Sequence, residues 1–285
     1  MTPEAGSPAL PRSVRIFGIP LLGLLLVALF IYLGFPYAKL GDRIADELQR
    51  RHGVRVEIES LSPRLHLSGP GLQARGVRAT LPDGDALRID RIALRPAWSA
   101  AWLRGDQAVY AEIESELGNL AGTVVLGGSN GFAGNVEQVM IGRLPFEPAA
   151  GLGSLEGLLD ATVDVLVGEQ GPAGQASFEA RDGSLAFAGF PMAIPFETLT
   201  GELDFGGEAL IAVNRVDLAG PMINANASGS VLQGASFSVA PLRLEVEIEA
   251  KAGLLSAMRG AGLRVDRNGK SKVRITGTVS QPNVR

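Results

Sequence analysis

The chain has 285 residues, of which 46% are hydrophobic and 20% charged, with a formal net charge of -4. This composition excludes a disordered polymer, and the mildly acidic balance provides no basic face for a nucleic-acid partner. Because the chain has no cysteine, disulfides, thiol catalysis and thiolate metal sites are excluded as well.

The first predicted element is a membrane-spanning helix. The segment 16–38 carries no charged side chain from Ile16 through Leu25 and Phe30 to Ala38. At about 1.5 Å per residue such a helix reaches roughly 35 Å, enough to cross a hydrocarbon core of about 30 Å. A cleaved signal peptide is the alternative, but its apolar region is typically about 7 to 15 residues and ends in small residues. The sequence therefore favours an uncleaved anchor, with the lipid bilayer as a partner.

The charges that flank this segment predict its orientation. Arg12 and Arg15 precede it without a nearby acid, whereas Lys39 and Arg43 after it are diluted by acidic residues. The positive-inside rule then predicts a cytoplasmic tail over 1–15 and export of the rest of the chain.

A short amphipathic helix is predicted over 39–52. Tyr37, Leu40, Ile44 and Leu48 recur at steps of three and four, which places them in one apolar stripe, and Gly53 provides the C-cap. Such a helix can lie on the membrane surface, cap the end of a sheet or pack on the core of its own domain.

From residue 53 to the end, the hydrophobic period is two. Each predicted strand has one aliphatic and one polar face, which is typical of a one-sided antiparallel sheet, and no long linker divides the segment 53–285. Register slips at Gly76 and between Ile89 and Ile92 predict β-bulges, and Ser62-Pro63 predicts a turn.

The predicted fold is therefore mainly β. A transmembrane helix and a short amphipathic helix precede a curved antiparallel sheet, which is either an open groove or an open sandwich. The aliphatic face is the candidate binding surface, because it must be covered by a second layer, a partner or lipid. The residues predicted to lie on this face include Ile113, Val163, Val165, Ile223, Val246, Ile248 and Ile275.

No catalytic pattern accompanies this fold. His52 and His66 are the two histidines and fall on unlike predicted elements, and nucleophile elbows and phosphate-binding loops are missing from the sequence. The acids Glu245, Glu247 and Glu249 lie at spacing two on one polar strand face, so we interpret them as a solvated surface. The sequence predicts a protein that is not an enzyme and that has no metal or cofactor.

Several phrases resemble a known family. The segments 35–40 (FPYAKL), 61–65 (LSPRL) and 69–72 (GPGL) resemble the N-terminal region of type II secretion system protein N. The closing segment 275–282 (ITGTVSQP) is similar to the wider AsmA-like group.

The resemblance implies a function in the cell envelope. It implies an inner-membrane protein with a periplasmic β domain, which joins other subunits of the machine that exports folded proteins through the outer membrane. The AsmA-like group is associated with grooved sheets that hold phospholipid acyl chains. Two hypotheses follow: an accessory subunit of the secretion machinery, or a lipid-binding or lipid-transfer module.

Overall fold

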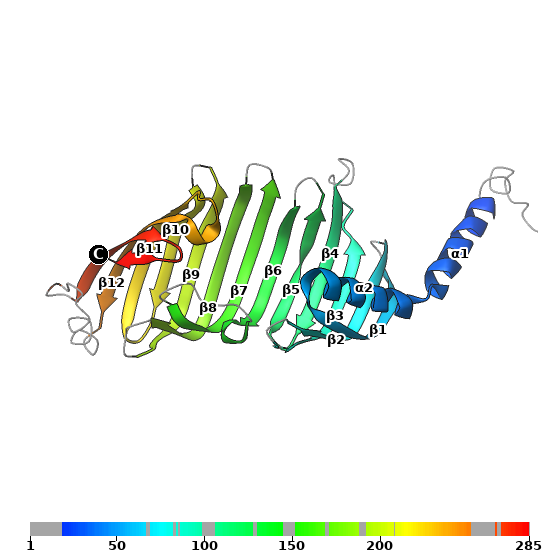
Figure 1. Cartoon of the computed structure of the whole chain (residues 1–285), viewed down its shortest axis with the longest axis horizontal. Helices are drawn as coiled ribbons and strands as arrows, with labels where there is room; N and C mark the ends of the chain where they lie inside the picture. The colour runs from blue at the N-terminus through cyan, green and yellow to red at the C-terminus, as the bar shows by residue number, and fades with distance from the viewer. Residues whose placement is uncertain are drawn as a thin grey trace, which may run out of the picture.

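The computed structural model describes residues 19–66, 69–81, 84, 86–98, 106–127, 130–144, 152–168, 171–187, 192–207, 209–251, 266 and 269–284. These residues form a mainly β protein with two helices and one open antiparallel sheet of 14 strands. The strands pair in sequence order from β1 to β14, so each one lies beside its neighbours in the chain (Figure 1).

The strands and short helices have the following bounds. The first half of the sheet contains β1 (Arg55–His66), β2 (Gly69–Thr80), β3 (Ala86–Pro96), β4 (Gln107–Ser115), β5 (Gly118–Leu126), β6 (Asn130–Met140) and β7 (Leu152–Gly168). The second half contains β8 (Gly171–Phe187), β9 (Ile194–Gly206), β10 (Ala209–Ala219), β11 (Ile223–Leu232), β12 (Pro241–Ala250), β13 (Lys270–Thr278) and β14 (Pro282–Val284). Two single 3-10 turns, η2 (Ile141–Arg143) and η3 (Phe237–Val239), follow β6 and β11.

The predicted membrane span is divided between two helices. Helix α1 (Ile19–Gly34) is apolar, and α2 (Tyr37–His52) follows a break at Pro36, whose ring cannot continue the hydrogen-bond ladder. The predicted boundaries differ accordingly, because Ala38 belongs to α2, while Ile16 lies outside the described residues.

Neither described helix alone has the length and apolarity of a membrane span. The pair Leu21–Gly34 and Tyr37–Arg51, bent by 58° at the break, meets that criterion only when taken together, by length and composition. Membrane insertion of the segment 16–38 therefore stays a prediction.

Helix α2 packs on the first strand of the sheet. A Cβ at Gly41 would lie 3.9 Å from side-chain atoms of Ile58 and Leu61, an ordinary van der Waals distance, so this side of the helix faces β1. Gly53 ends the helix with φ 69°, as its C-cap position predicted. The sequence left three placements open for this helix: on the membrane surface, at the end of a sheet, or on the core of its own domain. The structure shows it packed against strand β1 of the sheet.

One of the two predicted register slips is confirmed, and the predicted turn is wrong. The β3–β4 register shifts between Ile89 and Arg91. Gly76 has φ 58°, but the β1–β2 and β2–β3 pairings keep the same register on both sides of it, so the predicted shift is not found there. Ser62 and Pro63, predicted as a turn, lie inside β1. Proline is accepted there because β1 is an edge strand, so its outer side needs no ladder N–H.

A compact core lies on the aliphatic face of the second half of the sheet. Its buried members are Ile141, Ala180, Ile194, Phe196, Leu218, Ile223 and Ala250. Phe196 is 3% exposed. Since the three-residue turn η2 contributes Ile141, residues outside the strands help to cover this part of the face.

The meander gives the sheet two long margins. Odd-numbered strands all end at one margin, and even-numbered strands at the other, because every neighbouring pair is antiparallel. The hydroxyl of Tyr32 on α1 contacts the backbone of Arg64 and Gly71, where β1 ends and β2 begins. We call this side, at which the odd-numbered strands end, the anchor margin.

Candidate functional site: an apolar strip and an acidic hollow

The aliphatic face consists of rows of residues that pair from strand to strand. The central row crosses all 14 strands without a polar side chain: Pro63, Leu72, Leu94, Ala111, Gly122, Gly134, Val163, Ala176, Leu203, Val213, Gly229, Leu244, Ile275 and Val284.

Two flanking rows are apolar as well. One crosses β1 to β13 through Leu61, Ala74, Ile92, Ile113, Leu120, Val136, Ala161, Phe178, Gly201, Val216, Ala227, Val246 and Val273. The other crosses β3 to β14 through Pro96, Val109, Val124, Phe132, Val165, Gly174, Phe205, Ile211, Val231, Leu242, Gly277 and Pro282. We call these three rows the apolar strip.

All seven predicted face residues lie on the face that carries this strip. Ile113, Val163, Val165, Val246 and Ile275 belong to its rows. The other two, Ile248 and Ile223, lie beside the strip, where they pair with Ala225 and Ala250 respectively. Ile223 is buried in the core, and the other six are half-buried.

The strip is long enough for extended apolar ligands. At about 4.8 Å between strands, 14 strands span roughly 60 Å. One leaflet occupies about half of a hydrocarbon core of roughly 30 Å, so several acyl chains in series would fit along the strip. Its chemistry is that of aliphatic contact, because the rows contain no hydrogen-bonding side chain.

Glycines and phenylalanines determine how even the surface of the strip is. A Cβ at Gly201 would overlap the ring of Phe178, so this ring lies over the glycine on the neighbouring strand. The ring of Phe132 likewise reaches Gly134 on its own strand and Gly122 on β5. Such rings fill the spaces that glycines leave, which stabilises the sheet and smooths its surface. The sequence shows abundant glycine, but only the structure shows that these two rings lie over Gly122, Gly134 and Gly201.

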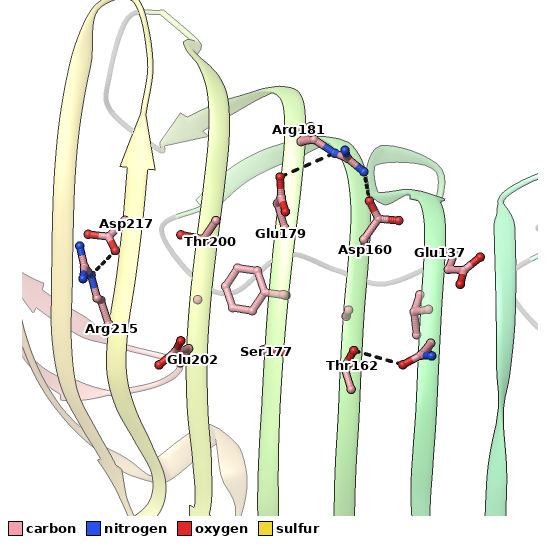
Figure 2. A pocket seen from close by; sticks show the side chains of 15 residues that line it. Glu137, Asp160, Thr162, Ser177, Glu179, Arg181, Thr200, Glu202, Arg215 and Asp217 are labelled. Carbon is pink, nitrogen blue, oxygen red and sulfur yellow. Dashed lines mark hydrogen bonds and ion pairs between the residues drawn. The ribbon is translucent and has the colours of Figure 1, made fainter.

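The opposite, polar face has a hollow that sequence reasoning missed. It has a volume of about 840 Å³ and extends over β6 to β10 (Figure 2). Its ionisable lining consists of Glu137, Asp160, Glu179, Glu202 and Asp217 with Arg181 and Arg215. A second hollow of about 650 Å³ adjoins it, and the two share Thr200, Arg215 and Asp217. The excess of carboxylates makes the first hollow acidic. Alternation along the strands predicted the polar face, whereas its hollows are lined by residues of several paired strands and cannot be found from one strand alone.

Most of the charge in this hollow is organised by pairing. Arg181 lies between Asp160 and Glu179, and Arg215 pairs with Asp217 (Figure 2). The pKa of Asp160 lies below its ordinary value of 3.8. The main cause is the backbone N–H of Gln138, which donates to the carboxylate at 2.8 Å, and Arg181 lowers the pKa further. The side-chain amide of Asn226, at 2.6 Å, and then Arg215 lower the pKa of Asp217. These carboxylates therefore stay ionised at neutral pH.

The pKa shifts of Asp160 and Asp217 do not suit these two carboxyls to general acid or base catalysis near neutral pH. A general acid or base near neutral pH requires a raised carboxyl pKa, and the two shifts described here run the other way. Within the described ranges, no group of three or more His, Asp or Glu side chains is placed to hold a metal ion.

A third site joins helix and sheet through aromatic side chains. The Tyr32 hydroxyl accepts from the backbone N–H groups of Arg64, at 3.1 Å, and Gly71, at 3.2 Å. Tyr37 is buried, packs edge-on against Tyr32 with 6.2 Å between ring centroids, and donates to the carbonyl of Tyr32. Phe35 packs against Tyr37 at 5.3 Å. We call these residues the aromatic joint.

Comparison of the chain with protein-family models, with curated proteins and with solved structures finds no match.

Proposed function

We propose that this chain is a non-enzymatic accessory subunit of a type II protein secretion machine, anchored in the inner membrane. In this proposal α1 belongs to the membrane anchor, and the sheet is a periplasmic surface that contacts other subunits. The observation that carries the proposal is the aromatic joint, because it brings together residues from all three phrases that resemble type II secretion system protein N.

All three phrases contribute residues to the aromatic joint. Phe35 and Tyr37 come from the first phrase, Arg64 from the second and Gly71 from the third. Together they fix the end of an apolar helix to the first hairpin of a sheet. A subunit that holds neighbours at a set position above the membrane needs such a fixed connection, whereas a flexible linker would leave the sheet free to rotate.

The proposal is tested by capture of the full-length chain from membranes in mild detergent. We expect secretion-machine subunits to co-purify. Cells that lack the chain should export folded substrates less well, and the wild-type chain should restore export. Tyr32→Phe, which removes the hydroxyl of the joint, should restore export less well than Tyr110→Phe. Normal export without the chain, together with an absence of captured subunits, would refute the proposal.

A second candidate function is lipid binding along the apolar strip. It is favoured by the uninterrupted rows, since a face of aliphatic residues across 14 strands provides a continuous surface for acyl chains. Strip residues that remain half-buried, such as Val163 and Val246, leave apolar area to be covered. The resemblance to the AsmA-like group agrees with this reading.

Mass spectrometry of the purified chain separates the two candidates. Stoichiometric phospholipid that survives gel filtration in mild detergent supports the strip as a lipid site. Lipid-free protein that captures secretion subunits supports the accessory role alone.

A further inference from the structure

Exposed large apolar side chains gather at one margin of the sheet. Within the described strands and connections, eight of them lie at the anchor margin: Leu65, Leu94, Trp98, Leu126, Leu166, Val167, Phe237 and Val239. Among the described residues of the sheet and its connections, only Leu158 and Met192 are comparably exposed and lie elsewhere. Isolated exposed apolar residues are ordinary, but their concentration along one margin indicates an interaction surface.

These residues come from successive strand ends along the length of the sheet. They follow or end β1, β3, β5 and β7, and two more lie in η3 between β11 and β12. Trp98 is 64% exposed and Phe237 is 57% exposed, although they are far apart in the sequence. The surface is therefore a long rim rather than a compact patch, which suits a flat partner better than a globular one.

The same margin is the one that the apolar helix contacts. Tyr32 of α1 hydrogen-bonds Arg64 and Gly71 at the end of β1 and the start of β2. Figure 1 shows β5 and β7 ending at the upper edge of the sheet, the side toward which α1 rises. If α1 is in the bilayer, these strand ends face the same leaflet.

The polar residues of this margin suit a membrane interface. Arg64 and Arg95 lie near the ends of β1 and β3, and the Arg95 guanidinium stacks 3.9 Å from the centroid of the Tyr110 ring. Arginine and tyrosine beside exposed leucine and tryptophan are the combination found where proteins meet lipid headgroups.

We propose that the anchor margin rests on the surface of the membrane that holds α1, so that the sheet lies along the bilayer. The exposed apolar side chains enter the interfacial zone, and Arg64 and Arg95 contact phospholipid phosphates. This proposal rests on the membrane anchoring in the proposed function, and it orients the sheet within that function. A strip that runs beside a leaflet has lipid available along its whole length.

Site-directed fluorescence tests this orientation, because the chain has no cysteine and a single introduced cysteine is unique. The full-length chain would be placed in nanodiscs of phosphatidylcholine and phosphatidylglycerol that contain spin-labelled lipid as a quencher. An environment-sensitive dye would be attached at Leu126→Cys, Val167→Cys or Val239→Cys on the anchor margin. Met192→Cys, similarly exposed at 44%, is the matched control near the other margin.

We expect a blue shift and quenching at the three anchor-margin positions and neither change at Met192→Cys. Arg64→Gln combined with Arg95→Gln should weaken quenching, and the loss should be larger in nanodiscs that contain phosphatidylglycerol than in nanodiscs without it, because the arginines attract anionic headgroups. A dye at Phe30→Cys reports separately whether α1 is in the bilayer. Quenching at Phe30→Cys without quenching at the margin overturns the proposed orientation but leaves the anchor intact, whereas no quenching at any position overturns both. Protection of the margin only after a secretion subunit is added would identify a protein contact and also overturn it.

Discussion

The hydroxyl of Tyr32, on the apolar helix α1, lies 3.1 Å from the backbone nitrogen and 3.2 Å from the backbone carbonyl oxygen of Arg64 in β1. A single phenol thus connects helix α1 to the edge of a 14-stranded sheet. Because it also accepts from the N–H of Gly71, it holds both strands of the first hairpin.

Removal of this hydroxyl should loosen the connection between helix and sheet. Tyr32→Phe keeps the ring but removes a group that bonds two strands, and we expect it to lower the free energy of unfolding by about 1 kcal/mol. Amide exchange at Arg64 and Gly71 should accelerate. Tyr110→Phe, on the neighbouring part of the sheet, should leave exchange at these amides unchanged. Equal exchange rates in Tyr32→Phe and wild type would contradict the role of the joint.

Truncation of the most buried ring of the core should be costly. Phe196 is 3% exposed and packs within the cluster around Ala180 and Leu218, so Phe196→Ala should destabilise the protein by about 3–5 kcal/mol. Phe237→Ala, at a site 57% exposed, is the matched control and should change the unfolding midpoint little in detergent. Denaturant titration followed by circular dichroism measures both, and similar midpoints for the two variants would place the core elsewhere.

Lowering the pH should destabilise the bulge in β6, because it protonates the carboxylate of Asp160 that accepts a hydrogen bond there. Its carboxylate accepts from the N–H of Gln138, a residue with φ 53° at the register shift between Val136 and Val139. Because the pKa of Asp160 is lower in the folded state, its stabilisation is present above the unfolded pKa, near 3.8, and is lost as pH falls through the folded pKa.

The corresponding variant is Asp160→Asn, which cannot ionise. Between about pH 5 and pH 2, wild type should lose more stability than Asp160→Asn does. Unfolding curves at several pH values measure the difference. Parallel losses in the two proteins would show that other carboxylates account for the acid sensitivity.

Filling the apolar strip should displace any lipid bound to it. Ala227 lies in a row of the strip and pairs with Val216 and Val246, whereas Ser228 follows it on the opposite face. Ala227→Phe should reduce co-purifying phospholipid, and Ser228→Phe should not. Equal lipid content in the two variants, with both folded, would exclude this part of the strip as a lipid site.

Much of the sheet could be predicted because apolar and polar residues alternate along each strand, and this alternation is visible in the sequence. Local period alone predicts Val163 and Val246 on one face, and in the strand register both residues lie in rows of the apolar strip. The slip of period at Gly76 predicted a bulge, and this glycine does have a positive φ, but neither of its strand pairings shifts register there. Pro63 misled the prediction, since a proline on an edge strand and a proline in a turn look alike in sequence.

The amino-acid sequence was enough to predict the apolar segment, the amphipathic helix and the one-sided strands, because these depend on the periodicity and identity of nearby residues. Three features became visible only in three dimensions: the aliphatic residues align into rows, Tyr32 contacts Arg64 and Gly71, and exposed leucines from distant strands share the anchor margin. These features depend on which strands pair and in which register. That pairing joins residues far apart in the chain through backbone hydrogen bonds, which carry no residue-specific signal.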